Sequence, residues 1–170
     1  MKVELCKRKS LKMGGMEGWM QLRPVQSDDL ENIALMMDYL GYTTLPSELK
    51  PILSDILSNP AMKVLLAVGT DGKPIGLINL RYFPVLRLKG YQVSIEELVV
   101  HPDFRGQGVG KKLLHFAREY AEEKGAVRLE VATSNKRASF RRKFYEKNGF
   151  EDAGSSVYRI EFNPCQGKST

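Results

Sequence analysis

The sequence predicts an α/β or α+β domain, and three observations carry that prediction. Apolar residues recur at every second position in several short stretches, which is typical of strands. In other stretches they recur at every third or fourth position, which is typical of amphipathic helices. The third observation is a glycine-rich segment that joins one predicted strand to the start of a predicted helix.

The elements follow one another in a simple order. A run from 19 to 25 predicts the first strand, and Ser27-Asp28-Asp29 predicts a cap for the helix after it. Asp71-Gly72 marks a hairpin turn, and 85–91 is predicted to be a connection. The further helices are predicted over 30–40, 46–59, 109–124 and 140–148, and the further strands over 63–69, 74–83, 92–100, 127–133 and 156–162.

Length and composition favour one soluble globular domain. The 170 residues suffice for one domain with a core, and 42% hydrophobic with 27% charged residues is ordinary for such a protein. We assign residues 1–18 to a flexible lead-in, 19–165 to the domain and 166–170 to a tail. Translation can start at Met1, Met13, Met16 or Met20.

The net charge and the positions of the cysteines indicate which kinds of partner and which cellular compartment to expect. A net charge of +6 suits an acidic ligand, but the basic residues are dispersed among 20 acidic ones, so we expect no nucleic acid. Cys6 and Cys165 lie near opposite ends, and with His101 and His115 they form no metal-ligand spacing. We therefore expect no metal. We also expect no membrane partner and a cytoplasmic location, because the sequence has no apolar signal region and no long apolar run.

The segment Arg105-Gly106-Gln107-Gly108-Val109-Gly110 has the chemistry of an anion site. The first N–H groups of a helix lack internal partners, and glycine lets the backbone approach a phosphate closely. A tight turn is the simpler alternative. The Walker A pattern does not fit, because no Ser or Thr follows Lys111, and the dinucleotide pattern lacks its third glycine.

The spacing that fits is R-x-x-G-x-G, with Arg105, Gly108 and Gly110, after a strand ending in V-x-P. In this the sequence resembles the GCN5-related N-acetyltransferase (GNAT) superfamily, whose loop holds the pyrophosphate of acetyl-coenzyme A. The resemblance implies a mixed sheet of six to seven strands, splayed after the fourth and flanked by about four helices. It implies coenzyme contacts from Leu98, Val99, Val100, Arg105, Gly106, Gln107, Gly108, Val109, Gly110, Lys111, Asn135 and Tyr145.

A second match lies further along the chain. It is similar to the C-terminal motif of small-amine acetyltransferases, with Tyr145 ten residues after Asn135, a spacing of the aminoglycoside-like and aminoalkylphosphonate-like branches. The matching residues are Ser134, Asn135, Phe144, Tyr145, Gly149 and Phe150. The chain departs from that branch at Arg141-Arg142-Lys143, where Ala-His is common, and the substrate therefore stays open.

Acetyl transfer to an amine needs a base and an acid. A primary amine is neutral about one part in a thousand at pH 7, roughly 4 kcal/mol to be supplied by deprotonation. The resemblance makes Glu96 the first candidate base, with Glu97 and Glu130 as rivals. Alternation along a strand predicts that Glu96 and Glu97 face opposite ways. Tyr145 is the candidate acid, and a packed helix tyrosine is its alternative interpretation.

The resemblance therefore implies an acetyl-coenzyme A-dependent N-acetyltransferase acting on a primary amine of a small molecule. A protein lysine or N-terminal amine acetyltransferase is one alternative, and a non-catalytic acyl-coenzyme A-binding module is another. No cysteine lies in the matched motifs, which favours direct transfer. Dimers are common in the family, so a homodimer is left open.

Overall fold

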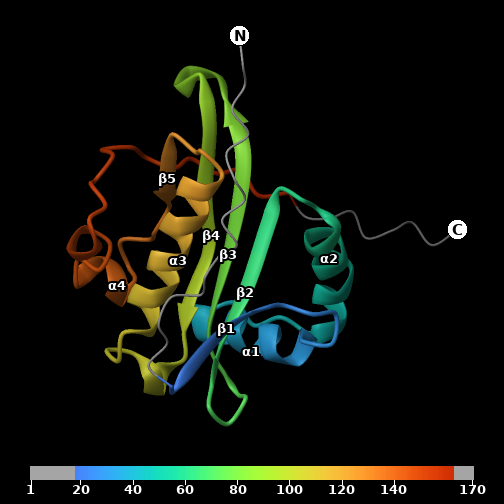
Figure 1. Ribbon diagram of the computed structural model, residues 1–170. Coiled ribbons are helices and arrows are strands. Elements are labelled where there is room, and N and C mark those ends of the chain that lie inside the picture. The colour runs from blue at the N-terminus through green and yellow to red at the C-terminus, as the bar shows by residue number, and fades with distance from the viewer. Residues whose placement is uncertain (1–17, 163–170) are drawn as a thin grey trace, which may run out of the picture. The chain divides into compact units, whose positions relative to one another are not determined.

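A computed structural model describes residues 18–162 of the chain. The chain divides into two compact units, residues 1–132 and residues 133–170, and each is described by itself. The first unit carries the sheet and the longer helices (Figure 1). The predicted lead-in lies almost entirely outside the described residues.

Five strands form one mixed sheet in the order β1-β2-β3-β4-β5. Neighbours run antiparallel except β4 and β5, which are parallel. The predicted α+β class and mixed sheet are confirmed, whereas a sixth or seventh strand is not found in residues 18–162. The strands are β1 Met20–Pro24, β2 Met62–Gly69, β3 Pro74–Val85, β4 Gly90–Val100 and β5 Arg128–Val131.

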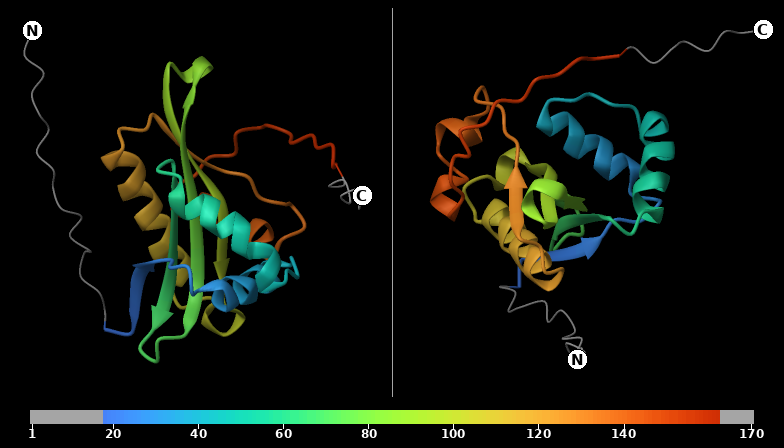
Figure 2. Two further views of the ribbon diagram at one scale, coloured as in Figure 1. Left: turned by 90° about the vertical axis from the view of Figure 1, so that its right-hand side faces the viewer. Right: turned by 90° about the horizontal axis from the view of Figure 1, so that it is seen from above.

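Helices cover both faces of the sheet (Figure 2). Helices α1, Leu30–Leu40, and α2, Pro46–Ser58, pack on one face, and α3, Val109–Glu123, packs on the other. The core on the α1–α2 face consists of Val25, Ile33, Met36, Leu53, Leu66, Val68, Leu77 and Val99. No helix in the described part of the chain is both long and apolar enough to cross a membrane.

The predicted cap of α1 is wrong in detail. Asp29 occupies the N-cap position, but its side chain makes no capping hydrogen bond. The carboxylate instead binds Arg23 of β1 at 2.6 and 2.7 Å and accepts hydrogen bonds from the Gln26 N–H and the Asn32 side chain. The ion pair therefore fixes the start of α1 to β1. Gly41 ends the helix in the left-handed region, at φ 96°.

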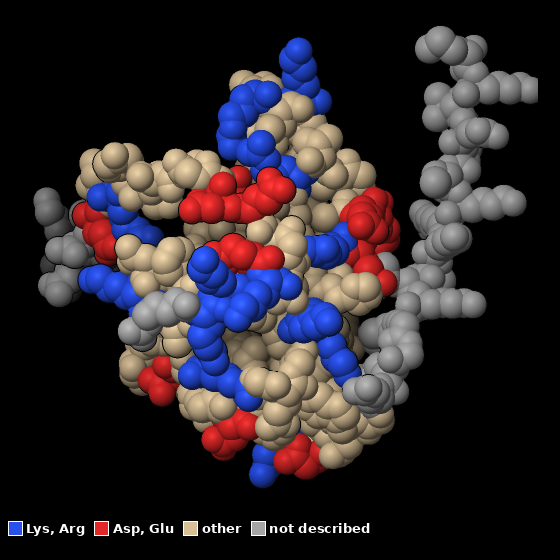
Figure 3. All heavy atoms as spheres, turned by 90° about the vertical axis from the view of Figure 1, so that its left-hand side faces the viewer, with Lys and Arg blue, Asp and Glu red and all other residues tan. Residues whose placement is uncertain are grey.

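The β3–β4 hairpin is longer than the sequence predicted. The strands extend to Val85 and from Gly90, so only a 3-10 turn, η1 Leu86–Leu88, remains of the predicted connection. Tyr82 and Tyr91 stack across the hairpin with ring centroids 4.7 Å apart. Basic side chains gather at the tip (Figure 3), where the sequence has Arg87 and Lys89.

The second unit departs most from prediction. The expected helix over 140–148 is instead a short α4, Ala138–Arg141, followed by a 3-10 turn, η3 Glu146–Asn148. Lys143 interrupts them because its backbone lies in the left-handed region, at φ 51°. The predicted strand 156–162 is also wrong: its residues form no strand pairing in the structure, and the Tyr158 side chain is 93% exposed.

Candidate functional site

One edge of β4 is open along its second half. β5 pairs with β4 only over Gln92–Ile95, whereas β3 pairs with β4 as far as Val100. Figure 1 shows the short β5 beside only part of β4. The segment Glu96–Val100 therefore has a strand on one side alone among the described residues. This agrees with the splay that the resemblance implied after the fourth strand.

Backbone groups at this edge alternate in direction. The His101 N–H donates to the Ile75 oxygen of β3 at 2.9 Å, which sets the pattern of the antiparallel ladder. By that alternation the backbone groups of Val99 point toward β3, and those of Leu98 and Val100 point to the open edge. The Val99 side chain is buried in the core. Of the three predicted contacts, Leu98 and Val100 thus have the right orientation, and Val99 does not.

The glycine loop leads from the end of β4 into α3. Gly106 and Gly108 lie at φ 82° and 89°, a region that other residues rarely adopt, and open space surrounds the position of a Cβ at each. Gly108 caps α3 without a side-chain hydrogen bond, and the first turn holds no acidic residue. The first helical bond runs from the Lys112 N–H to the Gly108 oxygen. The N–H groups of Val109, Gly110 and Lys111 therefore suit an external anion.

Two predicted side chains of the loop bind within the protein. The Arg105 Nε donates to the Val100 oxygen at 3.1 Å, and the Gln107 amide donates to the Asp103 oxygen at 2.7 Å. The first hydrogen bond holds the loop against the end of β4, and the second ties the loop to the 3-10 turn Pro102–Phe104. The hydroxyl of Tyr39, at the end of α1, shares a hydrogen bond of 3.0 Å with His101. No motif in the sequence predicted this contact between Tyr39 and His101.

A close approach of α3 to the sheet fixes the position of its first turn. A Cβ at Gly76 of β3 would lie 3.1 Å from the Val109 side chain, 3.1 Å from the Val99 oxygen and 3.2 Å from the Leu113 side chain. The Val109 and Leu113 side chains are fully buried. Gly76 therefore allows the first turn of α3 to sit directly on the sheet beside the open edge of β4.

The two glutamates of β4 lie on one face of the sheet, so the prediction that they face opposite ways is wrong. Asn79 of β3 pairs with Glu97, but the next residue, Leu80, pairs with Ile95, which makes Glu96 the extra residue of a β-bulge. Glu96 contacts Arg81 at 3.0 Å and Glu97 contacts Asn79 at 2.7 Å. Because Asn79 and Arg81 are two apart on a regular strand, both glutamates lie on the same face.

The candidate carboxylates have different environments. Burial raises the pKa of Glu97, the hydrogen bond from Asn79 partly opposes that rise, and the Glu96 charge adds to it. Glu96 is more exposed and forms an ion pair with Arg81. Glu130 lies on β5, where Arg128 contacts it at 3.6 Å. Glu97 is partly buried, and burial shifts the pKa of Glu97 alone among the three.

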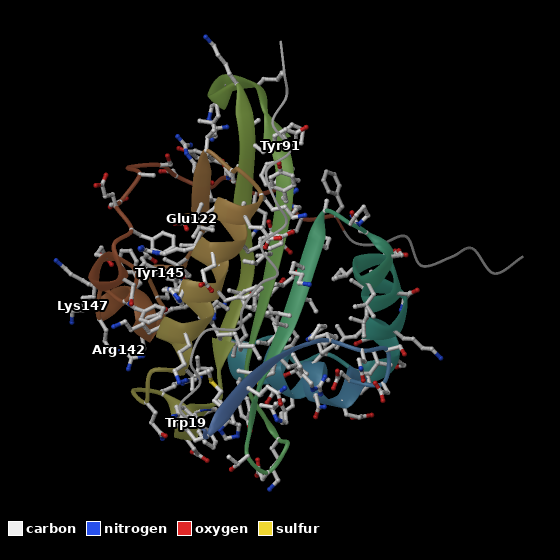
Figure 4. The ribbon with its side chains drawn as sticks, viewed as in Figure 1. Trp19, Tyr91, Glu122, Arg142, Tyr145 and Lys147 are labelled. Carbon is white, nitrogen blue, oxygen red and sulfur yellow. The ribbon has the colours of Figure 1, made fainter. Side chains whose placement is uncertain are left out.

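The second unit carries Asn135 and Tyr145. Asn135 is exposed in the turn before α4. The half-buried ring of Tyr145 packs edge-on against Phe144 and Phe150, and burial raises the pKa of its hydroxyl. Arg142 and Lys147 point outward from the neighbouring segments (Figure 4). Tyr145 thus keeps its proton at neutral pH.

The first unit has groups that fit a long ligand with an anionic end. The backbone of Leu98 and Val100 offers hydrogen bonds to an extended, amide-containing chain, as a neighbouring strand would. The N–H groups at the start of α3 and the two open glycines fit a pyrophosphate. Among the described residues, no group of three or more His, Cys, Asp or Glu side chains is placed to hold a metal ion.

The sequence matches a family model and several known proteins. The model of the Acetyltransferase (GNAT) family matches residues 27–150. An aminoalkylphosphonate N-acetyltransferase of Salmonella typhimurium is 30% identical over 78% of this chain and 86% of its own length. A glucosamine 6-phosphate N-acetyltransferase of Trypanosoma brucei brucei is 30% identical, over 77% and 88% respectively. An uncharacterised N-acetyltransferase of Methanocaldococcus jannaschii is 38% identical over 48% of this chain, which covers only 36% of that protein.

Solved structures share the fold. A transcriptional regulator from Bacillus halodurans superimposes with a TM-score of 0.76 at 26% identity, over 84% of this chain and 99% of that one. A structure of AAC(6')-Iy with a bisubstrate analogue, CoA-S-monomethyl-acetylneamine, superimposes with a TM-score of 0.69 at 21% identity, over 85% and 99%. The second likeness concerns the fold alone.

Proposed function

Because this chain belongs to the acetyltransferase (GNAT) family, an enzyme family whose acetyl donor is acetyl-coenzyme A, we propose that it acetylates a primary amine of a small molecule by direct transfer. The observation that carries the proposal is the junction of β4 and α3. There an open strand edge, a loop with two left-handed glycines and an uncapped helix start follow one another within the first unit.

The chain's own groups would hold the coenzyme in a defined order. The backbone groups of Leu98 and Val100 suit the pantetheine amides, because they face the open edge of β4. The N–H groups of Val109, Gly110 and Lys111 suit the pyrophosphate. Arg105 and Gln107 would act by holding the loop in shape, since both donate hydrogen bonds to its backbone.

We assign the proton acceptor to Glu97. Acetyl-coenzyme A supplies an acetyl thioester, so transfer forms an N–C bond, breaks an S–C bond and leaves a free thiol. Glu97 takes the proton of the acceptor's ammonium group, directly or through water, and a raised pKa brings a carboxylate closer to the working pH of a base. Tyr145 gives a proton to the departing sulfur, and the second proton that the acceptor nitrogen loses as the amide forms restores the Tyr145 hydroxyl, directly or through water. Its place in the C-terminal motif supports that role, and its raised pKa means that the hydroxyl still carries a proton to give.

The relatives favour a small acceptor. Aminoalkylphosphonate and glucosamine 6-phosphate, the substrates in the names of two relatives, are small amines that carry a phosphorus-centred anion. A protein amine is the alternative acceptor, and a binding module without turnover is the alternative class. Cytoplasmic location, homodimer formation and the absence of nucleic-acid and membrane partners stay predictions.

A panel of amines tests the function. Thiol release from acetyl-coenzyme A would be measured with aminophosphonates, amino-sugar phosphates, polyamines, aminoglycosides and peptides. We expect turnover with a small amine; turnover with peptides alone would favour the protein acetyltransferase. Stabilisation of the fold by acetyl-coenzyme A without thiol release from any amine would favour the binding module.

Three isosteric variants test the base. Glu97→Gln should lower kcat/KM by about 10²–10⁴-fold, the usual loss when a general base is removed. Glu96→Gln and Glu130→Gln, matched in chemistry and position in the sheet, should lower it less than about 10-fold. A large loss in Glu96→Gln with near-normal Glu97→Gln would return the role to Glu96.

A further inference from the structure

Asn79 is a polar exception in a buried stretch of β3. Every residue from Pro74 to Leu80 is buried, and the neighbouring side chains Leu77, Ile78 and Leu80 are apolar. The Asn79 side-chain amide donates one hydrogen bond, to the Glu97 carboxylate at 2.7 Å. Its Oδ1 is buried without a hydrogen-bond partner in the described part of the protein.

Such an amide is unfavourable for stability. A buried acceptor without a partner loses its hydration and gains nothing in return, whereas leucine has a similarly branched but larger side chain and no polar atom. Asn79 also lies beside an apolar partner on its other side, Val64 of β2. Packing of the sheet therefore gives no reason for an amide at this position, and within residues 18–162 its side chain hydrogen-bonds the carboxylate assigned as the proton acceptor.

We propose that Asn79 is a positioning residue, which orients the Glu97 carboxylate toward the acceptor and stabilises its ionised form. The inference rests on the proposed function, since it gives Asn79 a role in that reaction. The hydrogen bond ties one oxygen of the Glu97 carboxylate to β3, and both residues lie on the α1–α2 face because each is two positions from a core residue of that face, Leu77 or Val99. Without the amide, Glu97 would keep its burial and lose the donor that favours its charged form.

Few other charged groups act on Glu97. On its own strand Glu96 raises the pKa of Glu97, and Arg81 of β3 holds Glu96 in an ion pair. The α1 and α2 side chains packed on this core are apolar apart from Tyr39, whose hydroxyl is bonded to His101. Asn79 and Glu96 therefore act on the same carboxyl group in opposite directions: the first lowers its pKa and the second raises it.

Opposite shifts of the pH profile test the inference. The assay uses acetyl-coenzyme A and an amine that the wild type accepts. Asn79→Leu should shift the midpoint of the acid limb of the kcat/KM profile to a pH about 0.5–1 unit higher. Glu96→Gln should move it downward. Asn79→Ser, which opens space instead of filling it, should also move it upward. The KM for acetyl-coenzyme A should stay within about twofold in all three, because none of these side chains faces the glycine loop.

Gln92→Leu provides the matched control. Gln92 is also a buried amide of the sheet with an oxygen that lacks a partner among the described residues, but it lies on β4 five positions before Glu97. The same chemical change there should leave the midpoint of the acid limb unchanged. If Gln92→Leu and Asn79→Leu shift the midpoint equally, the effect comes from the sheet as a whole and the proposal is overturned.

A titration that needs no turnover separates this proposal from the proposed function. Carbon NMR of the side-chain carboxyl of Glu97 should show a higher pKa in Asn79→Leu than in the wild type. An unchanged Glu97 titration overturns the proposal even if the enzyme is active. Conversely, a shifted titration in a protein that acetylates no amine supports the hydrogen bond and contradicts the function, and with it the role of Asn79 in the reaction.

Discussion

Replacing Gly76 by alanine should weaken both the fold and coenzyme binding. The new Cβ would meet the Val99 oxygen and the Val109 and Leu113 side chains at 3.1–3.2 Å, which is shorter than an ordinary van der Waals contact. Because the Val99 oxygen belongs to the sheet and cannot move freely, the first turn of α3 has to shift by a few tenths of an ångström. Overpacking of this kind lowers the free energy of unfolding by about 1–3 kcal/mol. The reduced freedom of the unfolded chain offsets about 0.4–1 kcal/mol of that loss.

The effect on the coenzyme follows from the same shift. If two N–H contacts at the start of α3 are weakened, each worth about 0.3–1 kcal/mol, the Kd for acetyl-coenzyme A should rise roughly 3- to 30-fold. A net loss of about 1–2 kcal/mol lowers Tm by roughly 2–8 °C. Urea denaturation and calorimetric titration with acetyl-coenzyme A measure the two quantities on the same samples.

Two further variants sharpen the experiment. Gly69→Ala adds the same methyl group on β2, where it would meet the Asp71 side chain at 3.1 Å and the Ile75 side chain at 3.7 Å. A flexible side chain can move away, so stability should change by less than about 0.5 kcal/mol. Val109→Ala in the Gly76→Ala background removes one clash and should restore part of the affinity. Wild-type stability and affinity in Gly76→Ala would refute the argument that this glycine sets the distance between α3 and the sheet.

Three further predictions concern other parts of the chain. The Arg23 guanidinium lowers the pKa of Asp29 from 3.8 to about 2, so Asp29→Asn should cost about 2 kcal/mol of stability at neutral pH. That difference is fully present above pH 3.8, falls to roughly half by pH 3 and disappears as the pH drops through about 2, which urea titrations at each pH would detect. Gly108→Asp should abolish coenzyme binding in calorimetry, because it strains a residue at φ 89° and places negative charge beside the phosphates; wild-type Kd would contradict the assigned site. Tyr145→Phe should lower kcat by about 10²-fold with little change in coenzyme Kd, and equal kcat would exclude Tyr145 as the acid.

The sequence predicted the first unit well, because its signals are local. Hydrophobic period, Gly41, Pro46 and the hairpin turn fixed the first two helices and the strands to within a few residues. The glycine loop was recognisable because positive φ values and an uncapped helix start require particular residues at particular spacings. The match to the acetyltransferase family covers 27–150, which includes these elements except β1.

The errors arise where long-range contacts decide. The prediction that side chains alternate along β4 is wrong at Glu96, because the β-bulge there depends on the register with β3. A local sequence pattern does not reveal that register. Asp29 looked like a helix cap, but Arg23 of a different element takes its carboxylate. The helix over 140–148 is broken at Lys143, a residue type with no preference for a left-handed backbone. The sequence does contain a signal for Asn79, because a lone amide within an apolar strand indicates a candidate functional position.

The contact between Trp19 and Lys112 links the fluorescence of the tryptophan to the start of α3. Trp19 is the single tryptophan of the sequence (Figure 4), and the ammonium of Lys112 lies 5.1 Å from the centre of its ring. Indole emission responds to a charge held over the ring, and Lys112 lies in the first turn of α3, directly after the residues that would meet the coenzyme phosphates. We therefore expect ligand binding at the glycine loop to change the emission of Trp19 in the unlabelled protein, with no dye and no introduced residue.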